Sequence, residues 1–356
     1  VKKNGFTWAK NIYWGNLKHP FKRHNPDWTA KAALEFIEEH KDQPFYLHCC
    51  STLLHGPNRE WLKSMMEKEL ATGEGFLKKP LNLIDRKSVW ERIQKAGLTE
   101  AEVGYLWMDD SLGLILDKLD KLGIADNTIV VFVSDHGSEK KGSLIKTRGT
   151  EIPCLIRWPK VIKPGSVSRG LLQNTDFVPT WFELAKAKIP KGYHIDGKSL
   201  APVFKDPAVS IRKYIYGEQG AARAIKTEAF EYISIRYTDE QISEAQSKRA
   251  DRAYKTLLGL SSGISRARYF HPDIFSADQL YDLSKDPNSQ KNVADDSSYA
   301  GQLKKMKAIL TRTVKELGPR PYGDFVPGKG TSDAEASQKI LDQLAAYHAK
   351  ENKKKK

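Results

Sequence analysis

The sequence DNTIVVFVSDHG, residues 126–137, decides the fold. Its run 129–133 is apolar and rich in β-branched residues, as is typical of a strand buried on both faces of a parallel sheet. Asp135 and His136 follow this strand, and in open α/β sheets ligands bind beyond the carboxyl ends of the strands. A carboxylate and an imidazole before Gly137 suit a divalent metal at a tight turn. An aspartate that only caps the turn is the alternative, and this stretch leaves both interpretations open.

Length and composition limit the number of domains and the possible classes of function. With 356 residues the chain can bury a sizeable core, in one large domain or in one large and one small domain. The formal net charge of +14 favours an anionic partner, but no zinc-finger spacing, RNP motif or basic heptad helix supports nucleic acid. Cys49, Cys50 and Cys154 lie in apolar segments and are predicted to be core residues. No run is long and apolar enough to span a membrane, and these residues contain no signal peptide.

Local patterns predict alternating helices and strands. We expect helices at 27–40, 99–122 and 175–185, and further strands at 45–50 and 152–158. Asp27 or Thr29 is predicted to cap the first helix. Thr99 and Glu102 form a capping box for the second, and Gly123 ends it. A helix that leads into a buried strand is half of a βαβ unit, so this part of the chain is predicted to be α/β.

Other candidate site residues follow strand ends. His55 comes just after the predicted strand 45–50 and could converge with the end of strand 129–133, although a turn or core histidine is the alternative. Cations follow the later strand end, namely Lys140, Lys141, Lys146 and Arg148. They suit a substrate that carries an anionic ester, and exposed surface charge is the other interpretation.

The character of the chain changes near residue 206. Short strand patterns at 214–218 and 230–237 predict a small antiparallel sheet, and 302–317 predicts an amphipathic helix. A charged helical insertion is expected at 238–270, and a linker, a terminal helix and a Lys-rich tail beyond it. The predicted domains are therefore 1–205, 206–322 and 323–356.

Several motifs occur in a characteristic order: Pro44-Phe45-Tyr46-Leu47, His55-Gly56-Pro57, Trp107-Met108-Asp109-Asp110, Ser134-Asp135-His136-Gly137, Thr175-Asp176-Phe177-Val178-Pro179-Thr180 and Leu280-Tyr281-Asp282-Leu283. This series resembles the type I sulfatase family over most of the chain from about residue 27 to 310. The resemblance implies a sulfate-ester hydrolase with an alkaline-phosphatase-like fold, in which helices sandwich a mostly parallel sheet and a smaller C-terminal α+β subdomain follows. A sulfated carbohydrate or an aryl sulfate is the expected substrate, and a periplasmic or secreted location is expected.

The resemblance also implies roles for single residues. Asp135 and His136 match two ligands of the family's Ca²⁺ ion, for which Mg²⁺ is the alternative, and His55 matches the histidine that contacts the sulfate or the leaving-group oxygen. Lys141 is the best match for the sulfate-binding lysine.

Two departures concern the loop after residue 137. The spacing to Pro153 differs from the family pattern, so Lys146 is the alternative sulfate-binding lysine. Lys146 and Arg148 are also candidate substrate-binding residues. Glu151 stands where the family commonly has arginine.

The nucleophile of the family is the larger departure. Type I sulfatases use a formylglycine made from a Cys/Ser-x-Pro-x-Arg motif, and two aspartates complete their metal site. Cys49 and Cys50 lack that spacing, so these residues alone are not expected to turn over. We expect a fragment whose first strands, and whose nucleophile, lie upstream of Val1 or on a separate chain. A phosphodiesterase or phosphonate hydrolase of the same superfamily, and an inactive glycan-binding relative, are the alternatives.

Overall fold

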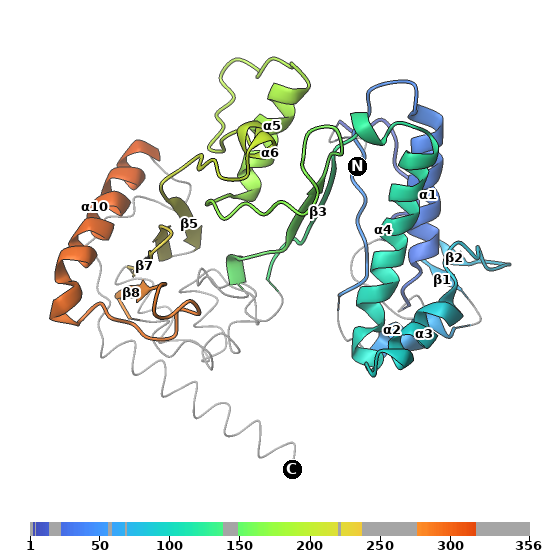
Figure 1. Ribbon diagram of the computed structural model, residues 1–356, viewed down its shortest axis with the longest axis horizontal. Helices are drawn as coiled ribbons and strands as arrows, with labels where there is room; N and C mark the ends of the chain where they lie inside the picture. The colour runs from blue at the N-terminus through green and yellow to red at the C-terminus, as the bar shows by residue number, and fades with distance from the viewer. Residues whose placement is uncertain are drawn as a thin grey trace, which may run out of the picture. The chain divides into compact units, whose positions relative to one another are not determined.

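A computed structural model describes residues 3, 5–13, 23–55, 59–67, 70–137, 149–219, 222–236 and 276–317 (Figure 1). The chain divides into two compact units. The first unit is Val1–Val130 with Trp158–Lys160, and the second is Val131–Arg157 with Val161–Lys356. Within the described ranges, no helix has the length and apolar character needed to cross a membrane.

The first unit is built on two long helices. α1 (Pro26–His40) and α4 (Val103–Lys121) lie side by side (Figure 1). Around them lie two shorter helices, a small antiparallel hairpin and two 3₁₀ turns: α2 (Arg59–Met65), α3 (Arg86–Lys95), β1 (Ala71–Thr72), β2 (Gly75–Phe76), η2 (Glu100–Glu102) and η3 (Ala125–Asn127). The predicted capping box is confirmed, since Thr99 and Glu102 exchange bonds at the entrance to α4, and Gly123 with φ of 69° follows its end.

The start of α1 differs from the prediction. The helix begins at Pro26 after Asn25, and no side chain caps it. Asp27 is instead buried, and its Oδ1 accepts hydrogen bonds of 2.9 Å from the backbone N–H groups of Leu83 and Ile84. The carboxylate therefore holds a distant loop rather than its own helix.

The predicted strand at 45–50 is wrong, because the structure assigns no strand to these residues. Phe45 and Leu47 pack against the core between α1 and α4, whereas Tyr46 is 62% exposed. The side chains alternate as in a strand, but no described strand pairs with this segment. Cys49 and Cys50 are consequently exposed, and their prediction as core residues is wrong.

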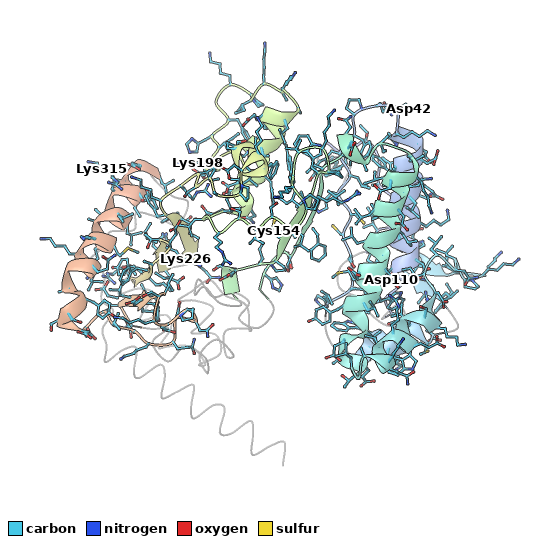
Figure 2. The ribbon with its side chains drawn as sticks, viewed as in Figure 1. Asp42, Asp110, Cys154, Lys198, Lys226 and Lys315 are labelled. Carbon is cyan, nitrogen blue, oxygen red and sulfur yellow. The ribbon has the colours of Figure 1, made fainter. Side chains whose placement is uncertain are left out.

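β3 (Val130–Val133), which belongs to the second unit except for Val130, pairs with β4 (Cys154–Arg157). The expected strand pair is present, but full burial on both faces is not: Val133 is 40% exposed and Leu155 66%. Cys154, labelled in Figure 2, is exposed as well, which corrects its prediction as a core residue. Among the described residues this sheet has two strands, so each strand lies at an edge.

A four-stranded antiparallel sheet forms the other part of the second unit. Its order is β5 (Ile215–Gln219), β6 (Ala222–Lys226), β7 (Phe230–Ile235) and β8 (Asp278–Asp282). One face packs on α10 (Ala300–Leu317) through Ile225, Tyr232, Leu280, Met306 and Leu310 (Figure 1). The predicted antiparallel sheet and amphipathic helix are confirmed, and β6 and β8 were not predicted as strands. The domain boundaries stay predictions, and the insertion, linker and terminal helix lie outside the described residues.

A buried ion pair fixes the helices between these two sheets. η5 (Asn174–Asp176) leads into α5 (Phe177–Leu184), and α6 (Ala201–Lys205) follows. Asp176 is fully buried and bonded by both guanidinium nitrogens of Arg212, with Nη1 2.5 Å from Oδ2. The backbone N–H groups of Gln173 and Lys198 donate to the same carboxylate at 2.8 and 2.9 Å. The predicted helix-starting Asp176 thus joins three segments of the second unit.

Candidate functional site

The pair Asp135 and His136 follows β3, as predicted. The backbone N–H of Ser134 donates to the Pro153 carbonyl at 3.4 Å, and that of Gly137 donates to the Gly149 carbonyl at 3.0 Å. These bonds tie both ends of the turn to the chain that enters β4. The Ser134 hydroxyl also donates to the His136 carbonyl at 2.8 Å, which closes the turn.

The hydrogen bonding of His136 determines which ring nitrogen is available. Its Nδ1 lies 2.7 Å from the Gly137 carbonyl oxygen, and a carbonyl can only accept, so Nδ1 carries the proton. The neutral ring then has its lone pair on Nε2, which lies 3.5 Å from Oδ2 of Asp135. The Asp135 side chain is 84% exposed and the His136 side chain 34%, so both side chains reach the solvent.

This arrangement fits two ligands of a divalent cation. A backbone carbonyl that holds the Nδ1 proton is the usual way in which a protein orients a metal-binding histidine. Among the described residues no three His, Cys, Asp or Glu side chains gather into a metal site, so this pair supplies two donors and not a full ligand set. Ca²⁺ takes six to eight ligands, so further oxygen donors are needed for it.

The predicted cations of the site follow residue 137. Lys141, Lys146 and Arg148 fall in 138–148, outside the described residues. Glu151, at the position where arginine was expected, lies 3.9 Å from Lys226 of β6, which Figure 2 labels. The Glu151 side chain is 62% exposed, so the pair stabilises little.

His55 belongs to the first unit and follows a strained residue. Its side chain is exposed, and its carbonyl accepts a 3.1 Å hydrogen bond from the indole N–H of Trp61. Leu54, just before it, has φ of 69°, a left-handed conformation that costs a bulky residue about 1 kcal/mol or more. The structure describes His55 and the Asp135–His136 pair each within its own unit.

One residue near His55 was not singled out by the sequence. His24 lies before the predicted helix 27–40; it is 4% exposed, and its Nδ1 lies 3.1 Å from the Thr52 hydroxyl. The pKa of the His24 imidazole is lowered to about 4, chiefly by burial and also by the nearby His55, while Glu60 acts in the opposite direction. No local pattern identifies such a histidine, because its partner lies 28 residues away.

Comparison with known proteins points to one family. The model of the family described as Sulfatase matches residues 3–187, and a model described as N-sulphoglucosamine sulphohydrolase, C-terminal, matches residues 136–244. An ulvan-active sulfatase of Formosa agariphila is 31% identical over 56% of this chain and 38% of its own length. An N-acetylglucosamine-6-O-sulfatase of Bacteroides thetaiotaomicron is 28% identical over 59% of this chain and 34% of its own length.

The fold has counterparts among solved structures. A structure from a study of glycosaminoglycan metabolism by Bacteroides thetaiotaomicron aligns with a TM-score of 0.54 and 22% identity, over 82% of this chain and 55% of that one. At that identity the likeness shows the fold, and the expected alkaline-phosphatase-like α/β class is confirmed. The chain spans between a third and two fifths of the length of the two sulfatases.

Proposed function

Because this chain belongs to the sulfatase family, we propose that it forms part of a sulfuric ester hydrolase acting on a sulfated carbohydrate, with an aryl sulfate as the alternative substrate. The observation that carries the proposal is the Asp135–His136 pair, whose two donor atoms converge at the end of β3. The ulvan and N-acetylglucosamine relatives support a carbohydrate substrate. A basic chain with a net charge of +14 would also attract a sulfated polyanion.

Each site residue has a proposed chemical part. Asp135 Oδ2 and His136 Nε2 would hold Ca²⁺, with Mg²⁺ as the alternative ion, and the bound ion would supply positive charge against the sulfate oxygens. His55 would donate a proton to the departing alcohol oxygen as a general acid. Lys141, or Lys146 in its place, would neutralise a further sulfate oxygen.

Formylglycine is the nucleophile that the family implies, and Arg148 is a further candidate for substrate contact. We propose that the enzyme works in the periplasm or outside the cell, where it would encounter sulfated polysaccharides. Localisation of a tagged chain in cell fractions tests that part of it.

Metal binding is the first test. Calorimetry with Ca²⁺ on the full chain should show binding that weakens tenfold or more in Asp135→Asn, because a carboxylate ligand loses its charge. Asp126→Asn is the matched control, since this exposed aspartate precedes the same strand at its other end. Equal Ca²⁺ affinity in both variants would exclude the proposed ligand.

Substrate binding is the second test, and it does not depend on a nucleophile. N-acetylglucosamine 6-sulfate should bind the full chain more tightly in Ca²⁺ than after chelation, and more tightly than unsulfated N-acetylglucosamine. Equal binding of the two sugars would refute the proposed substrate class. Sulfate release measured in the same samples separates a hydrolase from a protein that only binds glycans, and release of alcohol from a phosphodiester instead would favour the phosphodiesterase alternative.

A further inference from the structure

A buried histidine joins three segments beneath His55. The backbone N–H of His24 donates to the Ser64 hydroxyl of α2 at 2.9 Å, and its Nδ1 lies 3.1 Å from the Thr52 hydroxyl. His24 is 4% exposed; its bond to Ser64 is buried, and its bond to Thr52 is partly buried. The residue therefore links the chain before α1, the helix α2 and the loop that carries His55.

The loop itself is held at several points. Leu53 is 6% exposed within a hydrophobic cluster that also contains Trp61, and its N–H donates to the Ser51 hydroxyl at 3.1 Å. The strained Leu54 packs against the same cluster. The Trp61 indole then holds the His55 carbonyl. A left-handed leucine persists only where its surroundings enforce it, so these contacts together determine where His55 lies.

We infer that His24 is a positioning residue, which holds His55 in place through the Thr52 hydroxyl. It acts through the loop and not on the substrate. The inference rests on the proposed function only for the chemical role of His55. The placement of the loop is a property of the first unit by itself.

The surroundings of His24 favour a neutral polar side chain at position 24. Glu60 and Glu67 already pair with Arg23, at 2.8 and 3.4 Å, so a protonated imidazole would add a buried charge next to an existing ion pair. Burial accordingly favours the neutral form of His24. If an apolar side chain of similar size replaced His24, the Thr52 hydroxyl would lose its hydrogen-bond partner, which costs free energy.

Hydrogen exchange of the Trp61 indole N–H tests the inference, since that proton is bonded to the His55 carbonyl. In the full chain, His24→Leu and Thr52→Val should each accelerate its exchange about fivefold or more, because each removes the hydrogen bond between positions 24 and 52. His24→Asn should restore most of the protection, since the asparagine amide can reach the place of Nδ1. His40→Leu is the matched control, because it removes another histidine hydrogen bond of the first unit, between the His40 Nδ1 and the Phe36 carbonyl.

The backbone N–H of Ile84 serves as reference, because it donates a buried hydrogen bond of the first unit, to Asp27, that involves neither His24 nor Thr52. Faster exchange of the indole with an unchanged Ile84 signal supports positioning. Equal acceleration of both signals, or unchanged indole exchange in Thr52→Val, overturns it.

The proposed function is judged separately, by His55→Asn. That variant should weaken binding of N-acetylglucosamine 6-sulfate, and His24→Leu should weaken it to a smaller extent. A silent His55→Asn variant would overturn the role of His55 while leaving the exchange result intact.

Discussion

Acid should destabilise the first unit through His24. The pKa of this imidazole is about 4 in the folded chain, chiefly because of burial, against an ordinary value of 6.5. The folded state therefore favours the neutral ring, while the unfolded chain takes up a proton below about pH 6.5. The contribution of His24 to stability is therefore fully present above about pH 6.5, and it is lost as the pH falls from about 6.5 to about 4.

The size of the loss follows from the two pKa values. Each pH unit between them corresponds to about 1.4 kcal/mol, so the full loss below pH 4 is about 3 kcal/mol. Between pH 7 and pH 5 the unfolded histidine becomes almost fully protonated and the folded one stays neutral. The expected loss over this interval is about 2 kcal/mol in the free energy of unfolding.

Urea unfolding, followed by tryptophan fluorescence at pH 7 and pH 5, measures this loss. The wild type should lose about 2 kcal/mol more than His24→Asn, whose side chain does not titrate. Carboxylates whose pKa values are lowered are common to both proteins and cancel in the difference. Equal pH dependence in the wild type and in His24→Asn would refute the argument.

Two further predictions concern packing, and both are read from urea unfolding. Arg212→Met should lower the free energy of unfolding of the second unit by about 3–5 kcal/mol, because Asp176 is left charged and buried; adding Asp176→Asn should recover part of the loss, and a purely additive double mutant would contradict this. Gly104→Ala should destabilise the first unit by about 1–2 kcal/mol, because the new methyl overlaps the Trp61 ring; a net gain from the better helix propensity of alanine would show that the ring can move aside.

Helices were predictable because their signals are local. The capping box at Thr99 and Glu102 and the glycine at 123 mark both ends of one helix within 25 residues of sequence. The Asp135–His136 pair was predictable for a similar reason, since a strand end is a local feature. Which ring nitrogen of His136 lacks a proton could not be predicted, because that depends on the hydrogen bond to the Gly137 carbonyl within the turn.

The failures were residues whose partners lie far along the chain. Asp27 was predicted as a cap, but it binds amides 56 and 57 residues away. The 45–50 segment satisfies the period of a strand, yet a strand also needs a neighbour, and periodicity says nothing about one. His24 gave no signal at all, because the Thr52 hydroxyl that explains it is 28 residues distant.

The exposed thiols of the 45–50 segment have a consequence for handling the protein. Cys49 and Cys50 are neighbours, with Cα atoms about 3.8 Å apart, which is shorter than an unstrained disulfide allows. Burial raises the pKa of both thiols, that of Cys49 to about 11, so few thiolates form at neutral pH. At alkaline pH, air oxidation should join these residues to thiols of other molecules rather than to each other. Preparations kept at alkaline pH without a reductant should accumulate covalent dimers that a thiol reagent dissociates, visible as a band of doubled mass on a non-reducing gel.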